Sequence, residues 1–592
     1  MKKKLLFLPL IFIIILGSYF LFFSKKDEGL ENKAFSYDNL NLYFVMTDRF
    51  YDGNKKNNNS YGRPTFDSKD TNVGTFHGGD IKGLTKKLKE GYFTDLGINA
   101  LWITSPVEQI HGFVSGDNQG GFAHYGYHGY YALDFTSMDK NMGTVEEMRK
   151  FVDTAHSMGI RVILDVVINH VGYSNLQDMY DYEFYPIKND VDIETLNNWE
   201  PKENESFNSH NDTLINYNSK EEEWAKWWGT DWIRASLPGY TPGSNSDISM
   251  NLSGLPDIKT ETTEAVNLPP ILTRKWEKDE AQNNSKWIIP ASIKYRQDLG
   301  LSPSDYIVTW LSSWVEEFGI DGFRADTAKH IEPKIFLKLK EKSNIALKTW
   351  RLNNPDSPGA SWSEDFFMTA EVYGQGLAQN YYYDNGFDSV INFKFPKGDT
   401  LDHLEEIYLE YSNKINTTED FNVLSYISSH DTGLTRGNLI NLGTKLLLAP
   451  GGVQIYYGDE SNRLASTSII TTAIDQGSRS DMNWDSIDKE VLSHFQKLGQ
   501  FRNNHLSVGG GIHEMIDSTD YAFKRTYEKD GFSDKVVIGV AKDGEITIDV
   551  SNIFEEGSEV LDFYSNKTEK VIDGKITFKV SENLIVLLEE KK

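Results

Sequence analysis

The stretch TVEEMRKFVDTAHSMGIRVILDVVINH, residues 144–170, contains one complete unit of a helix followed by a strand. Thr144 and Glu147 stand at the spacing of a capping box, in which two side chains bond the first turn of a helix. Apolar residues then recur at helical spacing, at Met148, Phe151, Val152 and Ala155. Gly159 favours a helix end, and the nearly continuous apolar run at 162–167 predicts a strand buried on both faces.

Apolar runs of the same kind alternate with helical patterns from about residue 36 to residue 503. The predicted strands are residues 42–47, 100–104, 162–167, 322–325, 366–370, 389–393, 423–427 and 453–457. Such alternation is typical of parallel strands that are joined by helices. Eight strands of this kind predict an α/β fold of the (β/α)8 or TIM barrel type.

Two segments depart from this alternation. Residues 171–300 are polar, rich in Asn and Trp, and far too long for an ordinary loop, so we expect a domain inserted after the third strand. After residue 504, apolar residues alternate with polar ones at Ile546, Ile548 and Val550, and again at Ile576, Phe578 and Val580. We therefore predict a catalytic barrel over 36–170 and 301–503, an inserted domain B over 171–300, and a C-terminal antiparallel β-sandwich over 504–592.

Four of the tryptophans in the inserted segment stand close together in the sequence, at Trp224, Trp227, Trp228 and Trp232. The first three stand at i, i+3 and i+4, a spacing that places side chains on one face of a helix. Packing is favoured over sugar binding for these residues.

The first 26 residues have the pattern of an export signal. Three lysines precede an apolar run at 5–23, and Lys25 and Lys26 follow it. This run is longer than the usual core of a signal and nearly long enough to span a bilayer. A cleaved signal peptide and a retained N-terminal membrane anchor are therefore both open. In either case the chain is expected to be exported, to the periplasm or the cell exterior, with no other contact to the membrane.

The composition excludes several classes of function. The formal net charge is -27, which would repel a phosphate backbone, so no nucleic-acid partner is expected. The chain has no cysteine, and this excludes disulfides, thiolate zinc sites and iron–sulfur clusters. A neutral polymer as substrate is compatible with such a surface, and the protein is expected to be a monomer.

Polar side chains gather at the ends of the predicted strands, where a (β/α)8 barrel has its active site. Three of them are carboxylates: Asp326 after the fourth strand, Glu371 after the fifth and Asp431 after the seventh. They are accompanied by His170, Arg324 and His430. Packing does not require acidic residues at three separate strand ends, so this combination points to chemistry.

Cleavage of a glycosidic bond requires this set of groups. One carboxyl must protonate the leaving oxygen, and a second must act at the anomeric carbon. Arg324 stands two residues before Asp326, so on a strand both side chains point to the same face, where the guanidinium favours the ionised form of Asp326. Glu371 must instead stay protonated, which burial beside other carboxylates favours.

The runs DVVINH (165–170), GFRADTAKH (322–330), EVYG (371–374) and SSHD (428–431) resemble the four signature regions of glycoside hydrolase family 13, the α-amylase family. They stand in the order of the family, and Leu255-Pro256-Asp257 resembles its fifth region. The likeness extends from about residue 40 to residue 505. Within the family, the segments 224–260 and 476–484 look most like bacterial periplasmic α-amylases.

The resemblance implies a retaining glycoside hydrolase that cleaves internal α-1,4-glucosidic bonds of starch, glycogen or maltodextrins. Asp326 would be the nucleophile, Glu371 the acid and base, and Asp431 the group that stabilises the transition state. The residues implied to bind the substrate are His128, Tyr130, His170, Arg324, Lys329, His330 and His430. Among these, Tyr130 would stack on the sugar, whereas Lys329 and His330 would meet the leaving-group side.

The resemblance also implies calcium, Ca2+, as a cofactor. Asn169, Asp257 and the backbone carbonyl of His330 match the family's site between barrel and inserted domain, and such oxygen ligands suit this ion. A further ligand from the inserted domain cannot be placed. A second site is possible because one loop resembles the N-terminal calcium loop of cyclodextrin glucanotransferases. Its residues are Asp52, Asn54, Asn57, Asn58, Gly78 and Asp80.

Three alternatives to an α-amylase are open. The loop that starts at Asp52 also fits an α-glucan transglycosylase, such as a cyclodextrin glucanotransferase. An enzyme acting on α-1,6 bonds is disfavoured by the sequence Leu255-Pro256-Asp257. A non-catalytic glucan-binding protein is disfavoured because the three carboxylates and Arg324 are all present.

Overall fold

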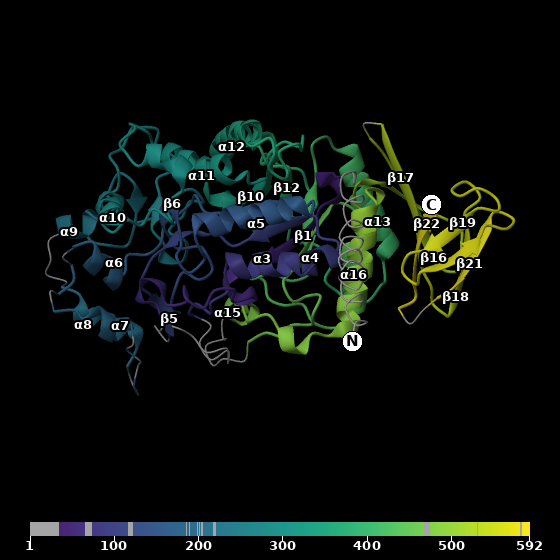
Figure 1. Cartoon of the computed structure of the whole chain (residues 1–592), viewed down its shortest axis with the longest axis horizontal. Coiled ribbons are helices and arrows are strands. Elements are labelled where there is room, and N and C mark those ends of the chain that lie inside the picture. Colours follow the sequence, from purple (N-terminus) through teal and green to yellow (C-terminus); the bar gives the residue numbers. More distant parts are fainter. Residues whose placement is uncertain are drawn as a thin grey trace, which may run out of the picture. The chain divides into compact units, whose positions relative to one another are not determined.

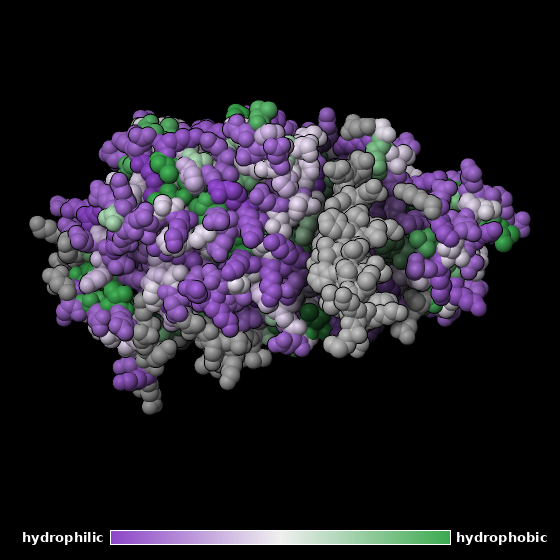
Figure 2. Space-filling model, in the orientation of Figure 1, coloured by the Kyte–Doolittle hydropathy of each residue, from purple (hydrophilic) through white to green (hydrophobic). Residues whose placement is uncertain are grey.

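The computed structural model describes residues 35–591, apart from 65–73, 117–121, 217–220, 467–473 and the positions 185, 189, 198, 200, 201, 203, 204, 530, 581 and 582. The predicted export signal at residues 1–26 lies outside the described residues. Within the described part of the chain, no helix has the length and apolar character needed to cross a membrane. The space-filling view in Figure 2 shows a face covered mainly by hydrophilic residues, in keeping with the net charge of -27.

Eight parallel strands form a closed barrel, as predicted, in the order β1-β14-β13-β12-β11-β10-β7-β2. The strands are β1 (Asn41–Val45), β2 (Ala100–Ile103), β7 (Arg161–Val166), β10 (Gly322–Ala325), β11 (Phe367–Ala370), β12 (Ser389–Asn392), β13 (Val423–Tyr426) and β14 (Gly452–Tyr456). Their ends lie within two residues of the predicted ones, and β10 has the predicted bounds. Every residue of these strands is buried, which explains why they appear in the sequence as apolar runs.

Helices surround the barrel. Helix α5 (Val145–Ser157) begins with the predicted capping box of Thr144 and Glu147, and Gly159 after it has φ +75°. Figure 1 shows α5 beside α3 (Ile81–Lys89). The longer helices that follow are α11 (Pro303–Phe318), α12 (Pro333–Asn353), α13 (Leu404–Thr417), α14 (Leu439–Leu447) and α16 (Lys489–Asn504). Shorter ones are α2 (Thr47–Phe50), α4 (Tyr92–Asp95), α15 (Ile474–Ser478) and α17 (Ser507–Gly510).

Small elements extend the barrel beyond the strand ends. The loop after β2 forms two small sheets, from β3 (Val107–Gln109) with β6 (Ala132–Met138) and from β4 (Val114–Gly116) with β5 (Phe122–His124). In the described part of the chain between β7 and α11, there are a two-stranded sheet and five α-helices. These are β8 (Ile233–Arg234), β9 (Asp257–Ile258), α6 (Leu176–Asp181), α7 (Ile193–Asn197), α8 (Phe207–Leu214), α9 (Glu221–Ala225) and α10 (Pro270–Ala281). The predicted domain boundaries stay predictions.

The four clustered tryptophans of the inserted segment, Trp224, Trp227, Trp228 and Trp232, are packing residues. All four are buried, and Trp232 stacks on Trp310 of α11 with ring centroids 5.9 Å apart. The expectation of a shared helix face was wrong, because α9 ends at Ala225 and Trp227 and Trp228 lie in the turn after it.

The C-terminal strands form two antiparallel sheets, as predicted. One has the order β15-β16-β17-β22-β19-β20, and the other pairs β18 with β21. Their bounds are β15 (Ile512–Met515), β16 (Tyr521–Lys529), β17 (Phe532–Val540), β18 (Glu545–Asp549), β19 (Glu559–Asp562), β20 (Lys567–Lys570), β21 (Lys575–Lys579) and β22 (Ile585–Glu590). Ile546 faces Phe578 across β18 and β21, and both lie in one apolar core with residues of the larger sheet, such as Val537 and Leu588.

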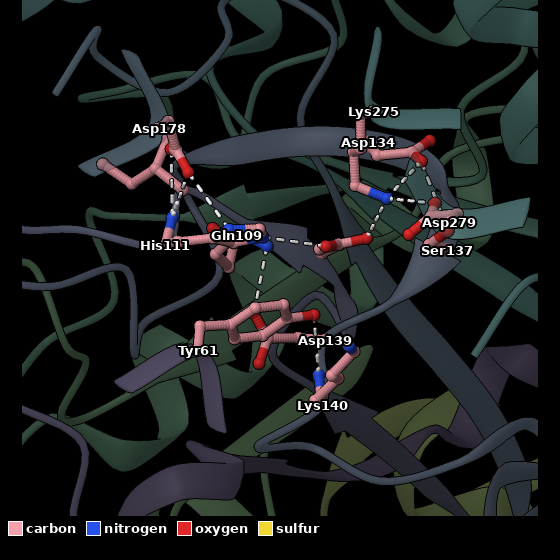
Figure 3. A network of polar contacts seen from close by, with 12 residues as sticks. Tyr61, Gln109, His111, Asp134, Ser137, Asp139, Lys140, Asp178, Lys275 and Asp279 are labelled. Atoms are coloured by element: carbon pink, nitrogen blue, oxygen red, sulfur yellow. Dashed lines mark hydrogen bonds and ion pairs between the residues drawn. The ribbon is translucent and has the colours of Figure 1, made fainter. Parts of the chain in front are cut away.

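A buried ionic network joins the inserted helix α10 to the loop after β2 (Figure 3). The Lys275 ammonium of α10 lies 2.7 Å from Glu108 of β3, 3.0 Å from Asp134 of β6 and 2.7 Å from Asp279 on its own helix. Lys275 is fully surrounded, with 1% of its surface exposed. Burial alone would raise the pKa of Glu108, but the charge of Lys275 and the contact with His111 together outweigh burial, and the pKa of that carboxyl lies below its ordinary value. The network therefore fixes α10 against the barrel through charge.

Replacing Lys275 is expected to destabilise this junction strongly. Lys275→Ala would leave buried carboxylates without their shared cation, which costs about 3–5 kcal/mol of unfolding free energy. Lys278→Ala, one turn along the same helix and half exposed beside Asp181, should cost less than about 1 kcal/mol. Urea unfolding of both variants measures the difference, and equal losses would contradict a stabilising role for the network.

Candidate active site

The barrel places two of the predicted carboxylates, Asp326 and Glu371, at one end because its backbone ladders continue past the strands. The N–H of Asp326 donates to the carbonyl of Val166 at 2.9 Å, and the N–H of Glu371 donates to the carbonyl of Ala325 at 3.0 Å. Each carboxylate is therefore fixed to the neighbouring strand by a backbone bond directly at its own residue. Parallel strands present their carboxyl ends on the same side, so residues far apart in the sequence become neighbours.

One buried guanidinium connects the carboxylates. Arg324 Nη1 lies 2.8 Å from Asp326 Oδ1 and 2.8 Å from Asp165 Oδ1, and Arg324 Nη2 lies 3.0 Å from Glu371 Oε2. Arg324 is 1% exposed, and its guanidinium lies 5.0 Å from the ring centroid of Trp102. Arg324 and Asp326 thus point to one face, as the strand spacing predicts, and the same cation also reaches Asp165 and Glu371.

The carboxyls differ in their pKa values. Burial raises the pKa of Glu371 to about 8; the negative charges of Asp326 and Asp431 add to this rise, and Arg324 opposes it. Burial raises the pKa of Asp326 to about 6, again against the effect of Arg324. Because these groups interact, their protons are released in steps that belong to the whole cluster. Near neutral pH, Glu371 holds a proton whereas Asp326 is ionised.

Asp431 is held by two neighbours on the other side of the site. Its Oδ1 lies 3.1 Å from Arg479 Nη2, and its Oδ2 lies 3.1 Å from His430 Nε2. Burial raises the pKa of Asp431, but His430, Arg479 and Arg324 outweigh burial, and its pKa lies below the ordinary value. With 37% of its side chain exposed, this ionised carboxylate can reach a ligand.

Tyr130 links the predicted substrate-binding residues. Its hydroxyl donates to Asp165 Oδ2 at 2.9 Å and lies 2.7 Å from His430 Nε2. Its backbone N–H donates to His128 Nδ1 at 3.1 Å, while His128 Nε2 is buried and bonds to no described residue. His170 Nε2 lies 3.1 Å from the carbonyl of Tyr130, and since a carbonyl only accepts, that nitrogen carries the hydrogen. Tyr130, His128 and His170 are therefore adjacent.

Lys329 and His330 lie at the end of the loop that follows Asp326. They belong to a short 3-10 helix, Ala328–His330, and both contact Asp247 of the inserted segment. The Thr327 N–H, just before them, donates to Glu371 Oε2 at 2.9 Å. This loop thus connects the acid candidate with the side of the site that the inserted segment borders.

The first candidate metal site contains side-chain oxygens that lack partners. Asn169 Oδ1, Asp257 Oδ1 and Glu332 Oε2 are all buried and bond to no described residue. The carboxyl of Asp257 is desolvated, which raises its pKa to about 7, and Glu332 contributes to the rise, so the two carboxyls lie near one another. Arg234 lies 2.9 Å from the other oxygen, Asp257 Oδ2. Three unpartnered oxygens of this kind fit a hard cation.

The second candidate metal site is a compact loop. Asp80 accepts from the N–H groups of Gly53 and Gly83, and its other oxygen lies 3.3 Å from Asn57 Nδ2. The Oδ1 atoms of Asn57 and Asn58 are buried and bond to no described residue. Gly78 has φ +96°, and a Cβ there would lie 2.6 Å from Asn58 Nδ2, so the loop leaves no room for a side chain.

Two members of this second set are held differently. Asp52 accepts from Asn58 Nδ2 at 3.0 Å, which keeps it in the cluster. Asn54 Oδ1 accepts instead from the N–H of Lys56, which uses that oxygen in a local turn. Among the described residues, no group of three or more His, Cys, Asp or Glu side chains is arranged to hold a metal. Both candidate sites therefore need amide and backbone oxygens in addition to their carboxylates.

Comparison with known proteins identifies the family. A family model described as "Alpha amylase, catalytic domain" matches residues 44–228. The periplasmic alpha-amylase of Escherichia coli K12 is 42% identical over 522 residues, which covers 86% of this chain and 73% of that protein. This chain belongs to the alpha-amylase family. It is an alpha-amylase-type glycoside hydrolase.

Other members of the alpha-amylase family match less closely. The cyclomaltodextrin glucanotransferase of Bacillus licheniformis is 39% identical over 179 residues, 28% of this chain and 24% of that protein. An alpha-amylase structure from Anoxybacillus has a TM-score of 0.56 at 22% identity and covers 94% of this chain and 100% of its own. One from Geobacillus thermoleovorans has the same TM-score and coverage at 19% identity. At these identities, the two structures support the barrel fold alone.

The candidate site also contains residues that sequence analysis did not single out. Asp165 stands in an apolar strand. A charged residue at a position buried on both faces requires a partner, and this feature of the sequence could have identified it. Arg479 lay in the quoted segment 476–484, where nothing indicated a contact with Asp431. Glu332 follows His330 by two residues, and Asp247 stood in a polar loop without any pattern.

Proposed function

We propose that this enzyme cleaves internal α-1,4-glucosidic bonds of starch, glycogen or maltodextrins with retention of configuration. The observation that carries this proposal is the guanidinium of Arg324, which bridges Asp326 and Glu371 while their pKa values differ. A retaining enzyme needs one ionised and one protonated carboxyl close together, at about 5–5.5 Å. A pair bridged by one guanidinium meets the requirement for proximity.

Each carboxyl has one task in the proposed mechanism. Glu371 gives its proton to the glycosidic oxygen as that bond breaks, while Asp326 attacks the anomeric carbon and forms a glycosyl ester. Glu371, now ionised, then removes a proton from water, which attacks the same carbon and releases Asp326. Asp431 stabilises the positive charge that develops on the sugar in both steps. Tyr130, His128, His170 and His430 position that sugar.

Loss of the nucleophile tests the mechanism. Asp326→Asn should lower kcat on maltoheptaose by about 10³-fold or more, because no covalent intermediate can form. Asp356→Asn, an exposed carboxylate in the loop between α12 and β11, is the control and should keep full activity. Products resolved over time should be short linear maltooligosaccharides. A fully active Asp326→Asn enzyme would exclude this role.

A transglycosylase of the cyclodextrin glucanotransferase type is the second candidate. The observations that favour it are the Asp52 loop and the partial identity with the Bacillus licheniformis enzyme. In that case an acceptor sugar, rather than water, attacks the glycosyl ester. Cyclic products, or products longer than the substrate, in the same time course would support this second candidate.

The rate of hydrolysis should have a bell-shaped pH dependence. We expect kcat/KM to fall below about pH 6, as Asp326 gains a proton, and above about pH 8, as Glu371 loses one. Asp431→Asn removes a negative charge that raises the pKa of Glu371. The alkaline limb of its residual activity should therefore shift to lower pH. An alkaline limb that stays in place would show that Asp431 does not act on Glu371.

Calcium is the cofactor that we propose for the first metal site. Asn169 Oδ1, Asp257 and the carbonyl of His330 would hold it, and the unpartnered Glu332 oxygen supplies a further ligand. The ion would join the third strand, the inserted segment and the loop after Asp326, and its contribution is to their stability. The Asp52–Asp80 loop is proposed as a second, independent calcium site.

Calcium removal should lower the melting temperature. An ion that binds only the folded state, at 100 times its Kd, adds about 2.7 kcal/mol to stability. We expect EDTA to lower Tm by several degrees in the wild type and in Asp356→Asn, and by much less in Asp257→Asn. Asp52→Asn measures the second site separately. If EDTA leaves the wild-type Tm unchanged, neither site stabilises the fold through calcium.

The enzyme is proposed to work outside the cytoplasm. The support is the pattern of residues 1–26 and the periplasmic location in the name of the Escherichia coli relative. Its partner is proposed to be an α-glucan only, with the protein acting as a monomer. N-terminal sequencing of the protein from cells distinguishes a cleaved signal from an anchor.

A further inference from the structure

A loop of the inserted segment contacts Lys329 and His330, which come three and four residues after the nucleophile candidate Asp326. Asp247 Oδ1 lies 3.1 Å from the Lys329 ammonium, and the Asp247 carbonyl lies 2.7 Å from His330 Nδ1. One residue thus engages both side chains, through its carboxylate and through its backbone. Lys329 and His330 are the residues expected on the leaving-group side of the cleft, so Asp247 borders that side.

The loop that presents Asp247 is closed on itself. The Ser244 N–H donates to the carbonyl of Ser249 at 2.7 Å, and the hydroxyls of Ser244, Ser246 and Ser249 lie within 3.1 Å of one another. Asn251 anchors the loop, because it accepts from the Gly243 N–H and donates to the carbonyls of Arg234 and Leu255. Asp247 is therefore held in place by its own loop, independently of Lys329.

The contact with Asp247 determines which nitrogen of the His330 ring carries the hydrogen. A carbonyl only accepts, so His330 Nδ1 carries a hydrogen, and in the neutral ring Nε2 is left as an acceptor. Lys329 only donates, and the Asp247 carboxylate only accepts. The side chains of Lys329 and Asp247 are 45% and 51% exposed, so a ligand can reach both. Together the three residues offer one donor and two acceptors, the complement of adjacent sugar hydroxyls.

Exposed aromatic rings complete this surface. Tyr381 is 55% exposed and stacks on Tyr382 with ring centroids 4.4 Å apart. Burial and the contact with Tyr381 raise the pKa of Tyr382, and the charge of Asp247 adds to the rise, so this carboxylate lies near the tyrosine pair. Rings next to hydrogen-bonding groups suit a sugar, which has an apolar face and a polar edge.

We infer that Asp247 is a specificity-determining residue of this enzyme, which with Lys329 and His330 binds the hydroxyls of a sugar on the leaving-group side. The inference rests on the proposed function and adds a recognition group from the inserted segment. A substrate with a sugar in that position gains bonds to the Asp247 carboxylate, whereas one with an aryl leaving group there has no hydroxyls to offer.

Two substrates separate this role from a structural one. The first is maltoheptaose, and the second is an aryl α-maltotrioside, whose sugars all lie on the other side of the bond that is cleaved. In Asp247→Ala, the ratio of kcat/KM for maltoheptaose to that for the aryl substrate should fall about tenfold, the effect of losing one bond to a charged group. Asp231→Ala, an exposed carboxylate of the same segment, should keep the wild-type ratio.

Each outcome decides one question. An equal fall for both substrates in Asp247→Ala, or an unchanged ratio, overturns the inference while leaving the proposed function intact. A wild-type enzyme that cleaves neither substrate overturns the proposed function itself. Asp247→Asn keeps an acceptor oxygen without the charge, and it should recover part of the ratio if the carboxylate binds the sugar directly.

Discussion

The buried positive charge of Arg324 is the constraint on which the site depends. Asp165, Asp326 and Glu371 all lie against this one guanidinium, and Arg324 has almost no contact with solvent. Several carboxylates cannot all be ionised in a buried space without a cation, because desolvation penalises each charge and the charges repel one another. One cation cannot neutralise three anions, and Glu371 is therefore the group that keeps its proton. In the proposed mechanism, this shortage of positive charge distinguishes the acid, Glu371, from the nucleophile, Asp326.

The barrel makes that arrangement possible. Arg324 and Asp326 come from the end of one strand, while Asp165 and Glu371 come from its two neighbours, β7 and β11. Backbone bonds fix the N–H groups of Asp326 and Glu371 to adjacent strands, so the distances are set by the ladder and not by flexible loops. Loops supply the other half of the site. Asp431 is held by Arg479, and the inserted segment reaches the site through Asp247 and Asp257.

The inserted segment is attached to the barrel at several independent points. Lys275 forms a buried ion pair with Glu108 in the loop after β2, and Trp232 stacks on Trp310 of α11. Asp257 pairs with His170 through a backbone bridge. These contacts share one consequence, since each fixes the inserted segment against the barrel. A wall of the cleft built on a separate segment can vary in sequence while the barrel ladder that holds the carboxylates stays the same.

The sequence by itself determined the eight strands, the capped helix α5, the C-terminal antiparallel strands and the family, because hydrophobic periodicity and short motifs are local properties of a chain. It also gave the three carboxylates and Arg324, since each follows a recognisable strand. It could not show that α9 ends before Trp227, that Asp165 shares the guanidinium, or that Arg479, Glu332 and Asp247 lie at the site. Those facts were decided by the tertiary structure alone. The partner of a polar side chain, such as Asp247 for His330 across 83 residues, is chosen by barrel closure and loop packing, which no local pattern encodes.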